Sequence, residues 1–307
     1  MSTSDAGLTD RVAAWQATGT VETVDGRRLW THRRTGEGTG PLIVLLHGFP
    51  TSSYDWRALL DSGALDAQHV LAFDFLGFGL SEKPADHVYT LAWQADAVEA
   101  LVAATPASAG RPVFLVAHDM GTSVATELFA RDLRGELGFG LGGALLFNGS
   151  ILLDRASPTT GQKLLRSRMG PVFARLMNER TFRAQFARIF SDAHPLSREE
   201  AADQWALVAH NGGQRIAHLT ISYMAERERF TERWHGAVRD WPGALSLAWG
   251  LQDPVATFAV LAGLRELRPG VPVTELPELG HYPQVEAPDR IAAAIDAALG
   301  RAAKGAR

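Results

Sequence analysis

The chain has 307 residues, of which 46% are hydrophobic and 21% are charged, and its formal net charge is -4. This composition is typical of a folded globular protein and excludes an intrinsically disordered chain. The mild net charge gives no electrostatic reason to expect nucleic acid or an anionic membrane as a partner. Because the chain has no cysteine, disulfides, a thiolate nucleophile and a cysteine-based zinc site are excluded.

The N-terminal residues, M-S-T-S-D-A-G-L-T-D-R, lack the basic start and the apolar stretch of a signal peptide. Apolar runs such as P-L-I-V-L-L are far too short to span a bilayer. We therefore expect a cytoplasmic protein without a membrane span.

A β-hairpin is predicted first, because two alternating stretches flank Asp25-Gly26 in T-V-E-T-V-D-G-R-R-L-W-T-H. Short apolar runs then alternate with helical patterns, for example at residues 91–104 and 121–131. This alternation predicts a mostly parallel sheet with helices on both faces, an α/β fold. The runs expected to form buried parallel strands are residues 42–46, 70–73, 113–117, 144–147, 245–249 and 271–276.

The alternation breaks between residues 151 and 239, where the pattern is helical and no strand run is found. We interpret this block as a helical cap domain, inserted after the sixth strand of a core formed by residues 1–150 and 240–307. Such a cap would cover the carboxyl edge of the sheet, where open α/β sheets bind ligands. Its predicted helices are residues 162–169, 172–177, 182–189, 198–208 and 214–229.

In L-V-A-H-D-M-G-T-S (residues 115–123) a predicted strand runs through a sharp turn into a predicted helix. This is the context of a nucleophile elbow, whose usual form is G-x-S-x-G. Asp119 stands at the nucleophile position and Gly121 keeps the second glycine, because a tight elbow leaves no room for a Cβ there. The pattern alone also fits an aspartate that caps the following helix.

Three further features favour the elbow. The loop L-L-H-G-F-P lies where such folds place an oxyanion hole, so the backbone N–H groups of Phe49 and Met120 would point into one site. Asp253 in W-G-L-Q-D-P and His281 in L-G-H-Y-P follow later strands, in the order nucleophile, acid, histidine of α/β-hydrolases. Alone, Asp253 would fit a turn or cap residue, and His281 would fit a loop histidine bonded to backbone.

Two other polar residues follow predicted strands. Asp74 is interpreted as a structural turn residue, and Asn148 is uncharged and could not orient a histidine as a carboxylate would. Asp253 is therefore preferred as the acid. A metal site is the weakest alternative, because His118 and Asp119 are adjacent and would point to opposite faces of a strand. We expect no metal and no cofactor.

The motifs H-G-F-P-T-S-S-Y-D-W, D-F-L-G-F-G-L-S-E-K-P, H-D-M-G, L-F-N-G-S and G-H-Y-P-Q-V-E resemble those of the epoxide hydrolase and haloalkane dehalogenase group of α/β-hydrolases. Within that group they are most similar to the mesoderm-specific transcript proteins. The similarity runs over most of residues 20–300 and thins in the predicted cap. It implies the α/β-hydrolase fold and an aspartate nucleophile, and it specifies no substrate.

An aspartate nucleophile narrows the reaction. A carboxylate that attacked an ester carbonyl would give a high-energy anhydride, whereas at a saturated carbon it displaces a leaving group and forms an alkyl-enzyme ester. Water activated by His281, itself oriented by Asp253, would hydrolyse that ester, and the oxyanion hole would stabilise the tetrahedral intermediate. We expect a small hydrophobic substrate with an electrophilic saturated carbon, an epoxide or an alkyl halide, and water as co-substrate.

The leaving group favours the epoxide. The haloalkane dehalogenases resembled here hold the halide with side-chain N–H donors at positions where this chain has Met120 and Phe49, which cannot donate. Epoxide hydrolases protonate the alkoxide with cap tyrosines, and the predicted cap has a single tyrosine, Tyr223, in a stretch that resembles one of these sites. His210 and Trp205 are alternatives for the missing second donor, although each is expected to pack in the core.

Two other functions stay open. One is a haloalkane dehalogenase-type hydrolase, and the other is a hydrolase-fold protein that binds a small molecule or signals with it. A complete triad argues against the second, because a pure binder has no need of one.

Overall fold

The structure is a computed structural model that describes residues 7–305. One eight-stranded sheet runs through it in the order β1-β2-β4-β3-β5-β6-β7-β8. β2 is antiparallel to β1 and β4, and every other pair is parallel. The strands are β1 (Thr20–Val24), β2 (Arg27–Arg34), β3 (Leu42–Leu46), β4 (His69–Phe73), β5 (Val113–His118), β6 (Leu141–Phe147), β7 (Ala244–Gly250) and β8 (Val273–Leu276). The predicted hairpin and all six predicted parallel strands are confirmed, with small differences in their bounds.

The hairpin turn follows from its two central residues. Asp25 and Gly26 both have positive φ, 48° and 73°, as the tight turns that match strand twist require. Aspartate and glycine tolerate this region of backbone conformation better than other residues do.

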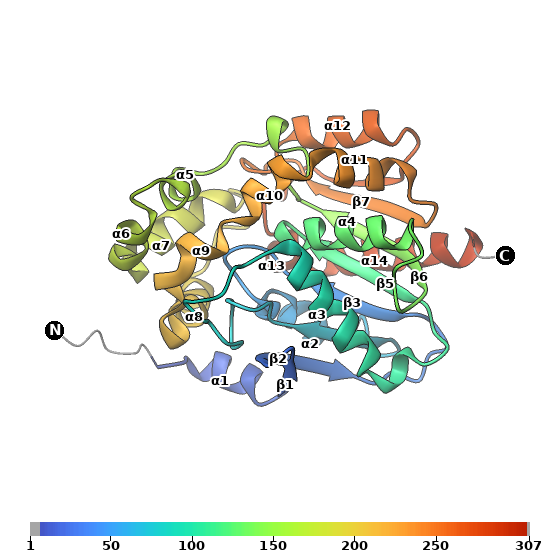
Figure 1. Ribbon diagram of the computed structural model, residues 1–307, viewed down its shortest axis with the longest axis horizontal. Coiled ribbons are helices and arrows are strands. Elements are labelled where there is room, and N and C mark those ends of the chain that lie inside the picture. The colour runs from blue at the N-terminus through green and yellow to red at the C-terminus, as the bar shows by residue number, and fades with distance from the viewer. Residues whose placement is uncertain (1–6, 306–307) are drawn as a thin grey trace.

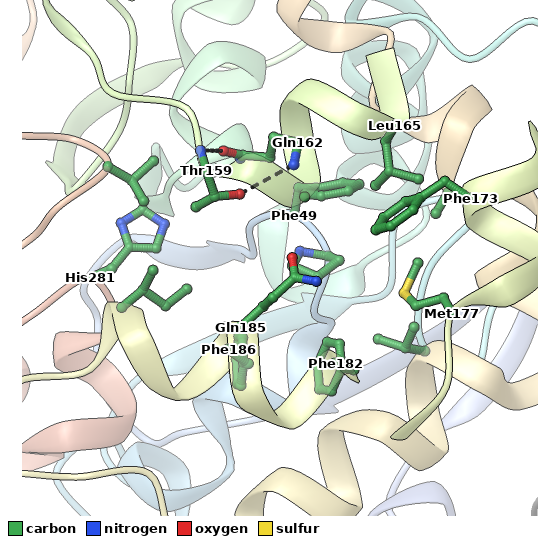
Figure 2. A pocket seen from close by; sticks show the side chains of 16 residues that line it. Phe49, Thr159, Gln162, Leu165, Phe173, Met177, Phe182, Gln185, Phe186 and His281 are labelled. Atoms are coloured by element: carbon green, nitrogen blue, oxygen red, sulfur yellow. Dashed lines mark hydrogen bonds between the residues drawn. The ribbon is translucent and has the colours of Figure 1, made fainter. Parts of the chain in front are cut away.

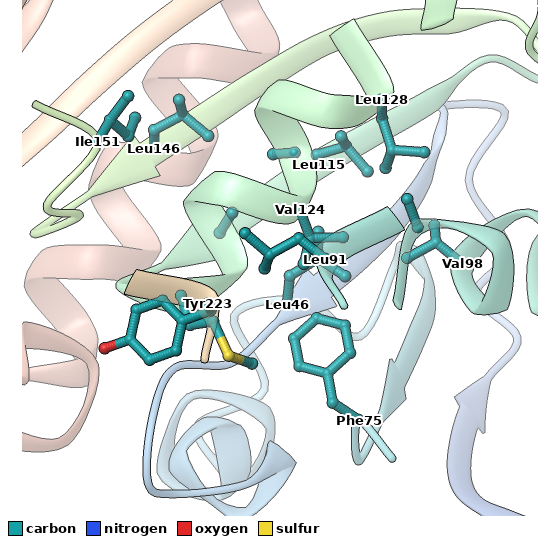
Figure 3. Close-up of a cluster of buried hydrophobic side chains, with 14 of the residues drawn as sticks. Leu46, Phe75, Leu91, Val98, Leu115, Val124, Leu128, Leu146, Ile151 and Tyr223 are labelled. Atoms are coloured by element: carbon teal, nitrogen blue, oxygen red, sulfur yellow. The ribbon is translucent and has the colours of Figure 1, made fainter. Parts of the chain in front are cut away.

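Helices cover both faces of the sheet, and the strand residues alternate between two cores. Leu42, Val44 and Leu46 of β3 lie in one core, while Ile43 and Leu45 lie in the other, as the two-residue period of a strand requires. Figure 3 shows part of the first core, where strand leucines pack against α4. The helices outside the inserted segment are α1 (Asp10–Gln16), α2 (Arg57–Asp61), α3 (Leu91–Ala103), α4 (Met120–Asp132), α12 (Phe258–Leu267), α13 (Pro283–Glu286) and α14 (Pro288–Gly305).

The chain between β6 and β7, residues 148–243, is called the inserted segment here, and it has no strand. Figure 1 shows α5 to α9 gathered at one end of the molecule, while α10 and α11 lead back toward β7. Its helices are α5 (Thr160–Arg166), α6 (Gly170–Leu176), α7 (Glu179–Phe186), α8 (Arg198–Ala209), α9 (Ala217–Thr220), α10 (Tyr223–Arg229) and α11 (Thr231–Asp240). Over residues 7–305, no helix combines the length and the apolar character that crossing a bilayer needs.

The prediction of one continuous helix over residues 214–229 is wrong. The chain there forms a 3₁₀ segment, then α9, then α10, with a break at Ser222. The Ser222 hydroxyl donates to the Tyr89 carbonyl oxygen at 2.9 Å, so a tertiary contact holds the chain where the local pattern favours helix.

Candidate active site

Asp119 alone makes the turn between β5, which ends at His118, and α4, which begins at Met120. Its φ of 43° and ψ of -109° lie in a region that residues with a side chain rarely occupy. A Cβ at Gly121 would lie 2.5 Å from the Leu46 carbonyl oxygen, so only glycine lets α4 cross β3 this closely. The Asp119 side chain makes no capping hydrogen bond to α4, and the alternative of an ordinary helix cap is therefore wrong.

The two carboxylate oxygens of Asp119 have different surroundings, although the residue is only 1% exposed. Oδ2 accepts a hydrogen bond from the Phe49 backbone N–H at 3.0 Å. Oδ1 is buried and has no hydrogen-bond partner among the described residues. The backbone N–H of Met120 is the second predicted donor. Among the described residues, it forms no hydrogen bond with either carboxylate oxygen of Asp119. One oxygen is thus held in the predicted oxyanion hole and the other is left unbonded.

His281 and Asp253 meet at the same sheet edge. His281 Nδ1 lies 2.7 Å from Asp253 Oδ2, while Asp253 Oδ1 accepts from the N–H groups of Val255 at 2.6 Å and Ala256 at 3.0 Å. Burial lowers the pKa of the imidazole, but the charge of Asp253, its hydrogen bond and the charge of Asp119 outweigh burial and raise the pKa above its usual value. Asp253 therefore fixes both the tautomer and the basicity of His281.

Asn148 positions Asp253, a role that the sequence did not predict. It sits just after β6 with φ of 46°, and its amide donates to Asp253 Oδ2 at 2.8 Å. The side-chain oxygen Oδ1 of Asn148 accepts from the Gly250 backbone N–H at 2.9 Å, which ties the ends of β6 and β7 together. The prediction that Asn148 does not orient the histidine agrees with this geometry, because Asn148 holds the acid instead.

His118 supports the site as a neutral residue. Its Nε2 donates to the His281 carbonyl oxygen at 2.7 Å, and its Nδ1 accepts from the Gln284 amide at 3.1 Å. Burial above all, together with nearby His281 and His47, lowers the pKa of His118 to about 3, against the opposing effects of Asp119 and of the hydrogen bond to the His281 carbonyl. Both nitrogens are in use, and residues 7–305 hold no group of three or more candidate ligands placed for a metal ion.

Asp74 lies outside the site and has the structural role expected of it. Its carboxylate accepts from the N–H groups of Ser53 at 2.8 Å and Leu80 at 2.6 Å, and from the Ser53 hydroxyl. These bonds tie the loop after β4 to the loop after β3.

Arg227 is the site residue that sequence reasoning missed. It projects from α10, is 2% exposed, and donates from Nε to Ser123 Oγ at 2.7 Å and from Nη2 to the Asp119 carbonyl oxygen at 3.0 Å. Nη2 also lies 3.8 Å from Asp119 Oδ1. A signal existed, because Arg227 follows Tyr223 by four residues and so shares its helix face.

Tyr223 lies on the same side of Asp119 as Arg227. The Arg227 guanidinium sits 4.7 Å above the tyrosine ring, and the ring lies 5.7 Å from that of Phe49. The Tyr223 hydroxyl accepts from the Gln162 amide at 3.4 Å. Burial and the charge of Asp119 raise the pKa of the phenol, while Arg227 acts in the opposite direction.

The other candidate donors are engaged elsewhere. Trp205 packs on Phe182, with ring centroids 5.6 Å apart, and His210 Nε2 lies 3.0 Å from the amide of Asn211. The remaining tyrosines bond other groups: Tyr54 donates to Asp203, Tyr89 to the Pro84 carbonyl and Tyr282 to the Phe49 carbonyl.

An apolar cavity of about 90 Å³ adjoins this site. Figure 2 shows His281 at one end and Leu165, Phe173 and Met177 at the other. Its walls are mostly aliphatic and aromatic, and the polar residues that line it are Thr159, Gln162, Gln185 and His281. Phe49 and His281 both line the cavity, and the backbone N–H of Phe49 connects this wall to Asp119. Such a cavity suits a small hydrophobic molecule.

Residues 43–294 match the family model described as the alpha/beta hydrolase family. The chain belongs to this family. LipZ of Mycobacterium tuberculosis is 57% identical over 261 residues, which cover 85% of this chain and 89% of that protein. The human mesoderm-specific transcript homolog protein is 34% identical over 287 residues, 92% of this chain and 85% of that one. The haloalkane dehalogenase DatA from Agrobacterium tumefaciens C58 shares the fold, with a TM-score of 0.74, 23% identity and coverage of 92% and 96%.

These matches confirm the predicted fold and the predicted resemblance to mesoderm-specific transcript proteins and haloalkane dehalogenases. As a member of the alpha/beta hydrolase family, this chain is a hydrolase with a small molecule and water as substrates. The family as a whole fixes neither the bond that is broken nor the nucleophile, so these follow only from the site's own geometry.

Proposed function

We propose that this hydrolase opens an epoxide to a diol, with Asp119 as nucleophile, His281 as general base and Asp253 as the residue that orients His281. One observation carries the proposal. Asp119 Oδ1 is buried without a hydrogen-bond partner among the described residues, while Oδ2 is held by the Phe49 N–H at 3.0 Å. An attacking oxygen needs free lone pairs, and an oxyanion hole needs its donor at the other oxygen.

In the first step, Asp119 Oδ1 attacks a ring carbon of the epoxide and the bond from that carbon to the ring oxygen breaks. The alkoxide that leaves takes the proton of the Tyr223 hydroxyl. In the second step, His281 Nε2 takes a proton from water, and the water oxygen attacks Asp119 Cγ. The negative charge then lies on Oδ2, beside the Phe49 N–H. Collapse breaks the bond between Asp119 Cγ and the alkyl oxygen, and the departing alkoxide takes the second proton of the water, so the diol leaves and Asp119 is a carboxylate again. The proton on His281 returns to the Tyr223 phenolate through solvent.

Charge changes at Asp119 favour this order of events. The Asp119 carboxylate raises the pKa values of both Tyr223 and His281. Once Asp119 is an uncharged ester that contribution is gone, so Tyr223 becomes a stronger acid and His281 stays neutral and able to accept a proton. Arg227, 4.7 Å from the Tyr223 ring, then no longer faces the negative charge of Asp119 and stabilises the phenolate or alkoxide. Arg227 thereby stabilises the leaving oxygen, as the missing second cap tyrosine would do by hydrogen bonding.

The inserted segment supports a cap role, as proposed for residues 151–239 over a core of residues 1–150 and 240–307. It provides Tyr223 and Arg227 above Asp119 and most of the cavity wall. A cap of this kind keeps water away from the first step.

A haloalkane dehalogenase reaction is the second candidate, and one observation favours it. Arg227 brings N–H donors within 3.8 Å of Asp119 Oδ1, where a departing halide would need them. Met120 and Phe49 supply no such donor from their side chains. The two candidates share Asp119, His281 and Asp253 and differ in what holds the leaving group.

The test is intact-mass detection of a covalent adduct on the His281→Gln variant, incubated with separate panels of epoxides and haloalkanes. Glutamine does not accept a proton from water as imidazole does, so the alkyl-enzyme ester should accumulate. An epoxide adds its whole mass, whereas a haloalkane adds its alkyl group only. Adducts from epoxides alone support the proposal, and adducts from haloalkanes alone overturn it in favour of the second candidate.

The matched control is the double variant Asp119→Asn/His281→Gln, which should form no adduct with either panel. An adduct of equal yield on the double variant would contradict Asp119 as the nucleophile. If neither panel labels His281→Gln but a small molecule binds tightly, the protein is a binding module instead.

A further inference from the structure

The segment from α5 to α7 has a charge opposite to that of the whole chain. Residues 160–190 hold seven basic side chains and one acidic side chain, Glu179, while the formal net charge of the protein is -4. The whole-chain value therefore hides a strongly positive region. All seven basic side chains are exposed: Lys163, Arg166, Arg168, Arg175, Arg180, Arg183 and Arg188.

Six of these seven cations form no ion pair with the described part of the protein. Arg166 pairs with Glu228 at 2.8 Å, and the other six form no ion pair with any residue in 7–305. Arginines of the sheet domain behave differently, since Arg131 contacts Asp96 and Glu99. Unpaired cations on one segment give that end of the molecule a positive field.

Exposed apolar side chains lie among these cations. Among the described residues, Met169, Val172 and Leu176 are 60%, 45% and 70% exposed, although each is large enough to favour burial. Arg175 and Leu176 follow Val172 within α6 by three and four residues, so these three share one face of the helix. Arg168 and Met169 lie in the turn directly before α6. We call these five residues the α6 face. Apolar side chains interleaved with arginine are typical of helices that lie at a membrane surface.

The other side of the same helices lines the cavity of the active site. Phe173 and Met177 of the α6 region, Leu165 of α5 and Phe182 of α7 form the end of the cavity away from His281. Figure 1 places α5, α6 and α7 together at the end of the molecule farthest from the C-terminus. A surface that touches the α6 face would therefore lie next to the apolar wall of the cavity.

We propose that the α6 face docks this hydrolase on an anionic lipid bilayer. Met169, Val172 and Leu176 enter the boundary between headgroups and acyl chains, while Arg168 and Arg175 bind lipid phosphates, with the field of the neighbouring cations in support. The substrate is then an apolar molecule that dissolves in the bilayer and reaches the cavity from it. The docking holds whichever reaction Asp119 performs.

The chemistry of the face favours lipid over other anionic partners. A nucleic acid would be bound by basic side chains with exposed aromatic rings for stacking, and the α6 face has aliphatic and thioether side chains instead. An acidic protein surface would pair with the arginines but would leave three exposed apolar side chains to be matched.

The experiment is sedimentation of the full-length protein with lipid vesicles. One vesicle is pure phosphatidylcholine, and in the other about one third of the lipid is phosphatidylglycerol. Binding is expected with the second only, and it should weaken steeply between low salt and about 0.5 M salt. Equal binding to both vesicles, or binding to neither, overturns the proposal.

Three variants sharpen the experiment. Arg168→Gln/Arg175→Gln should lower the partition coefficient by roughly 30-fold, since it removes two cations from the surface. Met169→Ser/Val172→Ser/Leu176→Ser should also weaken binding, and it should leave the dependence on anionic lipid unchanged.

The matched control, Arg134→Gln/Arg265→Gln, removes two exposed cations elsewhere and should bind as the unchanged protein does. If this control loses as much binding as the α6 variants, the α6 face is not the docking site. All variants change exposed side chains, and circular dichroism checks that they fold.

Discussion

The sheet edge and the inserted segment build the two sides of the active site in different ways. At the sheet edge, backbone groups hold the carboxylates: Phe49 N–H bonds Asp119, and Val255 and Ala256 N–H groups bond Asp253. On the other side, one side chain holds another, as Arg227 does with Ser123. The backbone of a fold is shared across a family, whereas single side-chain contacts change with one substitution. Under the proposed function, the sheet edge would set the type of chemistry, and the inserted segment would set the leaving group and the substrate.

The Asp119→Asn variant tests the sheet edge and should have the largest effect. An amide does not displace an alkoxide, so turnover should fall by roughly 10⁴- to 10⁶-fold, as loss of a covalent nucleophile does elsewhere. The measurement is steady-state hydrolysis of whichever epoxide labels His281→Gln. Full activity in Asp119→Asn would mean that the elbow carries a different function. The variant keeps the shape of the side chain but leaves the Arg227 charge unpaired, so its stability should fall, and circular dichroism serves as the check that it is folded.

The Arg227→Met variant tests the ion pair between Arg227 of the inserted segment and Asp119 at the sheet edge. Arg227 and Asp119 are both almost fully buried, and removing one charge leaves the other unpaired, which costs about 3–5 kcal/mol in buried pairs. The free energy of unfolding should fall by an amount of that order, as measured by denaturant titration. In Asp119→Asn/Arg227→Met much of this loss should return, because neither charge is left. Strictly additive effects in this double-mutant cycle would show that the two sides are not coupled.

The contrast between the two sides also explains what the sequence could predict. The strands and the elbow follow from apolar runs, Gly121 and the order of Asp119, Asp253 and His281, because these are local or family-wide signals. The roles of Asn148 and Arg227 could not be predicted, because they depend on contacts between segments far apart in the sequence. The hydrogen bond from Asn148 to Asp253 spans 105 residues, and that from Arg227 to Asp119 spans 108. The break at Ser222 escaped for the same reason. The cluster of basic residues around α6 was also missed, because the net charge of the whole chain does not show how charges are distributed along it.

The Tyr223→Phe variant separates the two candidate leaving groups. Phenylalanine keeps the ring that Arg227 and Phe49 contact and removes the proton donor. Loss of a general acid should slow epoxide opening by roughly 10²-fold, while displacement of a halide, which needs no proton, should change little. The measurement is the rate of adduct formation in the His281→Gln background, with and without Tyr223→Phe. Equal slowing of both substrate classes would assign Tyr223 to packing instead of proton transfer.

The smallest effect concerns the pKa of His281 and asks whether Asp119 and His281 share one electrostatic site. Burial lowers this pKa, and Asp253 and Asp119 together raise it above its usual value. The base is neutral imidazole, so hydrolysis of the ester should slow as the pH falls through the pKa that His281 has in the alkyl-enzyme, where Asp253 still raises that pKa and Asp119 carries no charge. Asp119→Asn removes one of the two charges, and the pKa of His281 should then be lower than in the unchanged protein.

NMR titration of the imidazole between about pH 5 and pH 9 measures the pKa of His281 in both proteins. His118, with a pKa of about 3, stays neutral over this range and serves as the internal reference. An unchanged His281 pKa would mean that the charge of Asp119 does not reach His281, and the proposed link between alkylation and basicity would then fail.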